Sequence, residues 1–243
     1  MALPKLTVMK HELTLPSSGE KITFRPFLVK EEKILMMALH GGESKDMIRA
    51  LKDIINNCVD KELKVDTLPP FDLEYIFLQL RARSIGDVIP IKYSIPEEQC
   101  KDGKKECVFE KELNLDDIKV QKNKKHKDLV DLTDTIKLKM RYPNMESAAA
   151  MSGVEGVEMV DKTFDIIGES IEYIIDGEEM HKLSDYTKAE TDEFLNSLST
   201  QNFKEVQAFF DTMPKLKHEI TAKCKVCGNE NTRVLEGMGD FFS

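Results

Sequence analysis

The feature that most constrains this fold is a Cys-Lys-Val-Cys-Gly segment at residues 224–228. It joins two runs of residues, 218–223 and 231–235, whose composition favours β-strands. Two cysteines at this spacing can present two thiolates to one metal ion, and the glycine after the second one allows the backbone to turn. Zinc prefers four ligands, so the segment predicts a second pair elsewhere in the chain.

Cys100 and Cys107 form the only other closely spaced pair, and they too lie between strand-like runs, 90–95 and 106–113. An Asp-Gly turn dipeptide between them favours folding the two thiols back toward each other. We therefore predict that two hairpins meet around a structural zinc ion. Its predicted ligands are Cys100, Cys107, Cys224 and Cys227.

Two other interpretations of these cysteines stay open, because the spacing from Cys100 to Cys107 is longer than in the usual zinc-binding turn. In one, these two are free thiols beside an isolated Cys-x-x-Cys segment. In the other, the Cys-x-x-Cys segment is a redox motif. Such motifs favour a helix N-terminus, which lowers the thiol pKa, whereas the residues after Cys227 favour a turn. The fifth cysteine, Cys58, is expected to be a small buried apolar residue.

The composition is that of a globular chain, with 33% charged and 41% hydrophobic residues among 243. This length can bury the core of one large domain or two modest ones. No apolar run approaches the roughly 18 residues of a membrane span, and the first residues lack the apolar core of a secretory signal. We expect a protein of the reducing cytosol, where cysteines favour metal binding or free thiols over disulfides.

Hydrophobic periodicity outlines the remaining elements. Leu13 and Leu15 alternate with polar residues, as do Ile22 and Phe24, and a Pro-Ser-Ser-Gly turn between them predicts a hairpin. Residues 135–142 also alternate, which predicts a strand. Apolar residues at helical spacing predict helices over 29–39, 44–57, 72–83 and 154–175, and two capped helices beginning near Thr187 and Ser199.

These elements predict an α+β fold with helices around a small antiparallel sheet. The sheet carries the zinc-ribbon-like four-cysteine site, which a helical insertion splits in the sequence. The predicted domains are an N-terminal hairpin with helices at 1–88, a discontinuous β module at 89–143 and 213–243, and the helical insertion at 144–212.

No motif of a known catalytic site is present: there is no glycine-rich phosphate loop, no serine elbow and no His-Glu-x-x-His segment. We therefore expect a non-enzyme without a small-molecule substrate. The basic run 119–127 could bind phosphate, which leaves a zinc-ribbon nucleic-acid-binding protein as the alternative. A net charge of −9 and the absence of Trp disfavour nucleic acid as the main partner.

Several longer stretches resemble the baseplate hub proteins of T4-like tailed phages. The first is 15–35, Leu-Pro-Ser-Ser-Gly-Glu-Lys-Ile-Thr-Phe-Arg-Pro-Phe-Leu-Val-Lys-Glu-Glu-Lys-Ile-Leu, continued by 72–83. The second is 203–217, which contains Phe-Phe-Asp-Thr-Met-Pro and is followed by the Cys-x-x-Cys-Gly segment and a terminal Phe-Phe. The resemblance extends over nearly the whole chain.

What this resemblance implies is a late phage protein needed to assemble the central hub of the tail baseplate. Its partners would be other baseplate and tail hub proteins, and it would act in the host cytoplasm during assembly. Family members of this kind either stay in the virion or serve as assembly factors, and the sequence is compatible with both.

Overall fold

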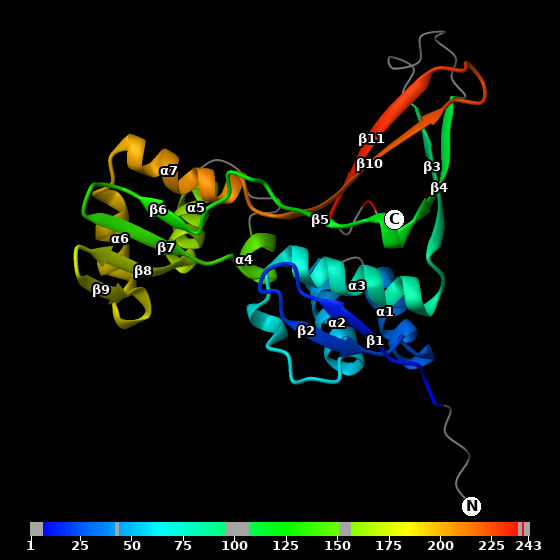
Figure 1. The fold of residues 1–243 in the computed structure, drawn as a ribbon, viewed down its shortest axis with the longest axis horizontal. Helices are drawn as coiled ribbons and strands as arrows, with labels where there is room; N and C mark the ends of the chain where they lie inside the picture. Colours follow the sequence, from blue (N-terminus) through cyan, green and yellow to red (C-terminus); the bar gives the residue numbers. More distant parts are fainter. Residues whose placement is uncertain (1–6, 42–43, 96–106, 151–156, 238–239, 241–243) are drawn as a thin grey trace, which may run out of the picture. The chain divides into compact units, whose positions relative to one another are not determined.

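The computed structural model describes residues 7–41, 44–95, 107–150, 157–237 and 240, and contacts divide the chain into two compact units. The first unit comprises 1–63, 71–121 and 215–243, and the second comprises 64–70 and 122–214. Both units combine helices with small antiparallel sheets (Figure 1). The predicted α+β class is therefore confirmed.

The first unit begins with the predicted hairpin. Strands β1 (His11–Thr14) and β2 (Lys21–Phe24) pair antiparallel, and Gly19 has a φ of 74° in the turn between them. The backbone N–H of Ser17 in the same turn donates to Asp72 Oδ1 at 3.0 Å. Asp72 is fully buried in the first turn of a later helix, so this bond fixes the hairpin against that helix. The three helices of this part are α1 (Val29–Gly41), α2 (Ser44–Cys58) and α3 (Pro70–Ser84).

Two further hairpins complete the first unit. One pairs β3 (Val88–Ser94) with β4 (Val108–Asn114), and the other pairs β10 (Lys215–Lys223) with β11 (Glu230–Glu236). The short strand β5 (Val120–Gln121) adds to β10, giving the order β11-β10-β5. A single-turn 3₁₀ helix, Leu115–Asp117, connects β4 to β5.

The prediction of one small sheet is wrong, because the described residues form four separate sheets. Within the described strands, β3–β4 and β10–β11 share no ladder. They instead contribute apolar side chains such as Phe109 and Ile220 to one common core. Packing the hairpins through their faces buries both sets of apolar side chains, which pairing at the strand edges would leave in water.

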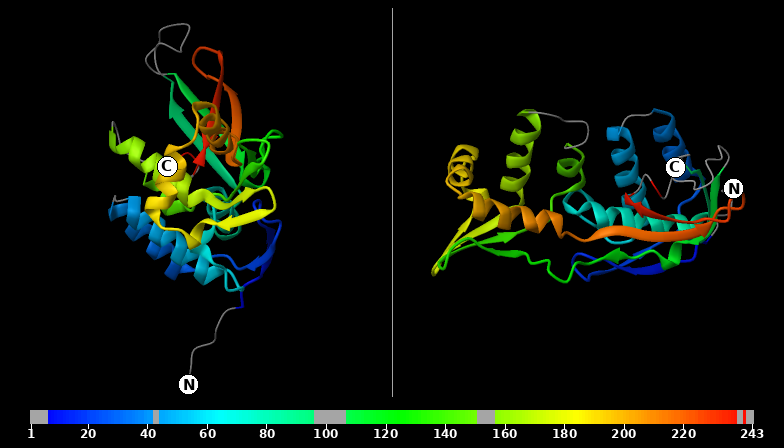
Figure 2. Two further views of the ribbon diagram at one scale, coloured as in Figure 1. Left: turned by 90° about the vertical axis from the view of Figure 1, so that its left-hand side faces the viewer. Right: turned by 90° about the horizontal axis from the view of Figure 1, so that it is seen from above.

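The second unit is built on the four-stranded antiparallel sheet β6-β7-β8-β9. Its strands are β6 (Leu129–Asp131), β7 (Ile136–Met140), β8 (Ile171–Asp176) and β9 (Glu179–Lys182). The accompanying helices are α4 (Met145–Ala149), α5 (Val157–Ser170), α6 (Lys188–Asn196) and α7 (Thr200–Asp211), with 3₁₀ turns at Val65–Thr67 and Leu183–Asp185. Figure 2 shows these helices beside the extended strands of the same unit.

The helix predicted over 154–175 ends at Ser170, and the residues after it form β8. Ile171 continues the helical spacing of α5, but the following residues include Ile174 and Ile175, which favour strands. Ile174 pairs with Leu138 of β7, and Gly177, with a φ of 61°, turns the chain into β9. Pairing between strands distant in sequence therefore determines that the residues after Ser170 form a strand and not a helix.

Residues 144–212, predicted as a helical insertion, therefore contain two strands besides α4 to α7. The compact unit also includes 64–70 and 122–143, and the pairing of β7 with β8 links the latter range to it. The predicted domain boundaries themselves stay a prediction. In the described chain, no helix is both long enough and apolar enough to cross a lipid bilayer.

The two capped helices are confirmed. Thr187 and Glu190 form a capping box at the start of α6, and the Ser199 side chain accepts the N–H of Asn202 at the start of α7. The apolar sides of both helices meet the sheet in one core. Its buried residues are Val130, Leu138, Met140, Ile167, Ile171, Leu183, Leu195, Val206 and Phe209.

Candidate metal centre

The Cys-x-x-Cys segment forms a tight turn between β10 and β11. The N–H of Cys224 donates to the carbonyl of Asn229 at 2.9 Å, and the N–H of Gly228 donates to the carbonyl of Cys224 at 2.9 Å. Gly228 has a φ of 72°, a conformation that a residue with a Cβ rarely adopts. The predicted role of this glycine is confirmed.

A third cysteine reaches this turn from the other hairpin. Cys107 directly precedes β4, and its carbonyl accepts the N–H of Ile95 at 2.8 Å, which extends the β3–β4 pairing by one position. The sulfur atoms of Cys107, Cys224 and Cys227 all lie within 4.8 Å of one another. The structure thus brings together three of the four predicted ligands, and Cys100 lies outside the described residues.

The Cys224 thiol has a lowered pKa, to about 6. The largest cause is the backbone N–H of Cys227, followed by that of Val226, whose nitrogen lies 3.4 Å from the sulfur. Burial opposes the shift, while the Cys107 thiol and the Val108 N–H add to it. The lowered pKa favours the thiolate form of Cys224, which is the form that binds metals.

This lowered pKa arises without a helix. The redox interpretation places Cys-x-x-Cys at a helix N-terminus, whereas here β10 precedes the segment and β11 follows it. Amide groups of the turn itself stabilise the thiolate, as expected where several backbone N–H groups converge on one sulfur.

The donor set fits a soft metal ion such as Zn²⁺, because all three atoms are sulfur. Sulfurs bound tetrahedrally at about 2.3 Å from zinc would be separated by roughly 3.8 Å, so small side-chain movements suffice. Cys107 and Cys224 are 1% and 3% exposed and Cys227 is half-buried, so the site is largely closed to water. Such closure is typical of structural rather than catalytic zinc.

One buried polar atom of this turn is unsatisfied among the described residues. Asn229 belongs to the same turn, and its side-chain Nδ2 is buried without a hydrogen-bond acceptor among the described residues. A buried donor without an acceptor is costly.

Charged and aromatic side chains hold the two hairpins together beside the sulfurs. Lys225 of the turn forms an ion pair with Glu110 of β4 at 2.5 Å, and Lys92 of β3 contacts the same carboxylate at 3.0 Å. Arg233 of β11 lies 4.2 Å from the centre of the Tyr93 ring in β3. These partners are distant in sequence and follow no short motif, so no sequence pattern predicts them.

Cys58 and the basic run 119–127 are not part of the sulfur cluster. Cys58 is 1% exposed, and burial raises the pKa of its thiol to about 11, so the expectation of a buried apolar role is confirmed. In the basic run, Lys119, Lys122, Lys124, Lys125 and Lys127 are exposed. His126 differs from these exposed lysines, because its two ring nitrogens lie 3.0 Å from Thr212 Oγ1 and 3.0 Å from the Tyr142 hydroxyl.

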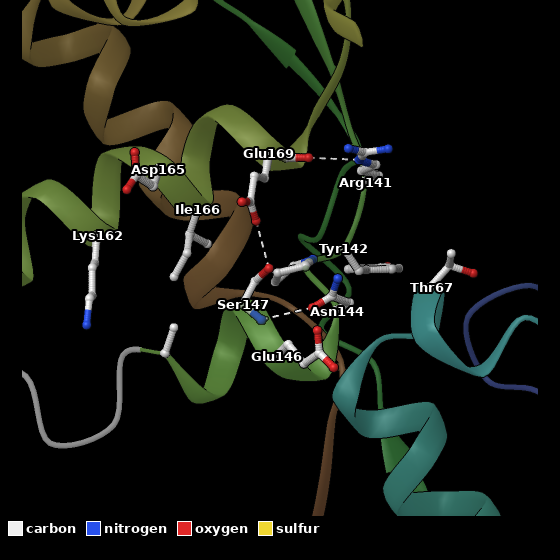
Figure 3. A pocket seen from close by; sticks show the side chains of 12 residues that line it. Thr67, Arg141, Tyr142, Asn144, Glu146, Ser147, Lys162, Asp165, Ile166 and Glu169 are labelled. Carbon is white, nitrogen blue, oxygen red and sulfur yellow. Dashed lines mark hydrogen bonds between the residues drawn. The ribbon is translucent and has the colours of Figure 1, made fainter. Parts of the chain in front are cut away.

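The second unit contains a cavity of about 700 Å³ whose lining includes neither cysteine nor histidine. Figure 3 shows Ser147 donating its hydroxyl to the Glu169 carboxylate at 2.7 Å. Arg141 Nε donates to the backbone carbonyl of Glu169 at 2.8 Å, and Asn144 Oδ1 accepts the Ser147 N–H. These polar groups satisfy one another and join α4 to α5, so they act as structural contacts.

The model of the family described as T4 bacteriophage base plate protein matches residues 8–243. No curated protein and no solved structure matches the chain.

Proposed function

Because this chain belongs to the family of T4 bacteriophage base plate proteins, we propose that it is a structural or assembly protein of the baseplate hub. It acts through contacts with other tail and baseplate proteins rather than through catalysis. The observation that carries this proposal is the family match over 8–243, which includes both units. The protein works in the host cytoplasm during assembly and is either retained in the virion or released.

A structural zinc ion is part of this proposal. Three sulfurs from two hairpins support it, and Cys100, in the segment between β3 and β4, is the proposed fourth ligand. The zinc would connect the hairpins in a reducing compartment, where a disulfide would not persist. Because metal binding requires the folded arrangement, it would add directly to the free energy of folding.

A phage in which this gene carries a stop codon tests the assembly role. Extracts of infected cells are separated by sedimentation, and we expect baseplates to be absent and to return when the wild-type chain is supplied from a plasmid. Normal baseplates without the protein would overturn the proposal. Mass spectrometry of purified virions then separates a retained subunit from a released assembly factor.

The nucleic-acid-binding alternative rests on the exposure of the five lysines of the basic run, Lys119, Lys122, Lys124, Lys125 and Lys127. It predicts binding to DNA or RNA that weakens steeply as salt increases. An electrophoretic mobility shift at low and moderate salt tests this, with all five lysines replaced by Gln in a control variant. An absence of binding at low salt excludes the alternative.

A further inference from the structure

Helix α1 exposes an unusual amount of apolar surface. Val29, Met36, Met37 and Leu39 are 79%, 54%, 65% and 54% exposed, and Leu28, just before the helix, is 41% exposed. Apolar residues are distributed around the whole circumference of α1. A helix with this pattern is normally buried on every side. In the described chain, α1 is buried on one side only.

The neighbouring helix α2 provides an internal comparison, because the two helices pack side by side in the same unit (Figure 2). α2 is strongly amphipathic, and its outward residues are polar. The exposed ones are Lys45, Asp46, Arg49, Asp53, Asn56 and Asn57. The apolar outward side is therefore specific to α1 and is not a general property of this part of the surface.

The orientation of α1 is fixed by a buried ion pair. Glu31 is completely buried, and its carboxylate accepts Arg25 Nη2 at 3.0 Å and the N–H of Leu28 at 2.8 Å. Ala38 is buried two turns later on the same side. Rotating α1 to hide its methionines would expose this ion pair and break its hydrogen bonds, so the outward apolar side stays outward.

The charges on the outward side of α1 are mostly basic. Along the helix, Val29, Lys33, Met36 and His40 follow one another at steps of four, three and four residues, and therefore form one stripe. Lys30 is also exposed, and Glu32 is the exposed acidic residue of the helix. A surface of apolar side chains mixed with cations is complementary to an apolar surface flanked by carboxylates.

The charges of this surface disfavour a second copy of the chain as its partner. The five exposed side chains offer on the order of 400 Å² of apolar surface, which is the size of the largest apolar patch on a typical monomer, a patch that is often functional. Two copies meeting through α1 would bring the exposed Lys33 of one copy toward the same cation of the other, which is unfavourable.

We propose that the outward side of α1 is a docking surface for an amphipathic helix of another baseplate protein, whose apolar side is flanked by Asp and Glu. Methionine side chains are flexible and polarisable, and they adapt well to a helix laid along them. This inference rests on the proposed assembly role and adds to it the surface and the kind of partner.

The test uses the other baseplate proteins of the same phage, each purified singly and titrated against the full-length chain by calorimetry. The variant carries Met36→Glu and Met37→Glu. The matched control is Met180→Glu in β9, where the methionine is 65% exposed, as Met37 is. We expect the double variant to lose at least about tenfold in affinity for one of these proteins and the control to lose none.

A second variant tests the charges. Lys33→Glu lies on the exposed side of α1 and should weaken the same interaction, and the wild-type affinity should fall as salt increases. The melting midpoints of all variants are compared, so that a folding defect is recognised. Equal binding by wild type and the double variant would overturn the inference while leaving the assembly role standing.

Two further outcomes would contradict either the proposed function or the inference. If none of the baseplate proteins binds the wild-type chain, the proposed function itself fails. If analytical ultracentrifugation shows that the wild-type chain dimerises and that the Met36→Glu, Met37→Glu variant is monomeric, a second copy occupies the surface and the inference is wrong.

Discussion

The Cys107 sulfur lies within 4.8 Å of the Cys224 sulfur, although the two residues belong to different hairpins. The chain between them includes 122–214, which is most of the second unit. A metal ion bound at this point would therefore close a long loop of the chain. Closing a loop of this length removes much conformational entropy from the unfolded state. A metal ion bound here would therefore stabilise the fold more than one that closes a short loop.

The first prediction concerns metal content. The purified protein should contain about one zinc ion per chain by elemental analysis. Cys107→Ser and Cys224→Ser should each lose it and melt at a lower temperature, because two or three remaining ligands bind zinc weakly. Cys58→Ala is the matched control, since Cys58 is equally buried but outside the sulfur cluster, and this variant should keep the zinc.

The fourth ligand is tested separately by Cys100→Ser. We expect this variant to lose zinc as the other two do. Zinc retained in Cys100→Ser would show that a different group completes the site, and zinc absent from the wild-type protein would refute the metal site altogether.

The second prediction concerns the buried Arg25–Glu31 ion pair. Glu31→Ala leaves the Arg25 guanidinium, which is only 18% exposed, without its carboxylate. The free energy of unfolding should fall by about 3 kcal/mol, as measured by urea denaturation. Glu32→Ala removes an exposed carboxylate one position away and should change it by less than about 0.5 kcal/mol. Similar losses in the two variants would contradict this assignment.

The same ion pair makes the stability of the folded protein depend on pH in the acidic range. Burial raises the pKa of Glu31, but hydrogen bonds from Arg25, the Leu28 N–H and Lys30 outweigh it, so the pKa lies below its ordinary value of 4.5. A lowered carboxyl pKa stabilises the folded protein above the ordinary value, and this contribution is lost as pH falls through the folded-state pKa. The difference in free energy of unfolding between wild type and Glu31→Gln should therefore become smaller as the pH of the denaturation measurement is lowered.

The third prediction concerns His126. Its ring lies 5.0 Å from the Phe209 ring and 5.5 Å from the Tyr142 ring, and burial lowers its pKa, an effect that Asp128 partly opposes. Since Thr212 Oγ1 donates to the Ala208 carbonyl, it accepts the Nδ1–H of His126, which leaves Nε2 to accept from Tyr142.

A histidine with a lowered folded-state pKa costs stability when it is protonated. The folded protein should therefore be most stable above the ordinary histidine pKa and lose stability as pH falls toward the folded-state value. His126→Gln should show a smaller decrease of the melting midpoint between pH 7.5 and about pH 5.5 than wild type. His11→Gln serves as the comparison, and an identical pH profile for wild type and His126→Gln would rule out this role.

The fourth prediction concerns the turn of the metal centre. Gly228→Ala places a Cβ on a residue with a φ of 72° and should cost about 1 kcal/mol of stability. The strain should also weaken metal binding, which a competition with a zinc chelator measures. Gly41→Ala is the control, because its Cβ would meet only an ordinary contact with Asp46 at 3.5 Å. Unchanged stability and metal affinity in Gly228→Ala would show that the turn can relax.

The sequence determined those features that depend on neighbouring residues. The β1–β2 hairpin follows from alternation around a Gly19 turn, and the capping box of α6 follows from Thr187 and Glu190. The turn at Cys224 also follows from local chemistry, since the spacing of the two cysteines and Gly228 leaves few other backbone paths.

Only the tertiary structure decided which of these elements meet. Helical spacing runs through Ile171, yet β7 is available as a partner and turns the following residues into a strand. Likewise, Cys107 joins Cys224 because β3–β4 and β10–β11 bury their apolar sides in one core. The physical reason is that burial and strand pairing depend on surfaces supplied by distant segments, whose arrangement no local pattern encodes.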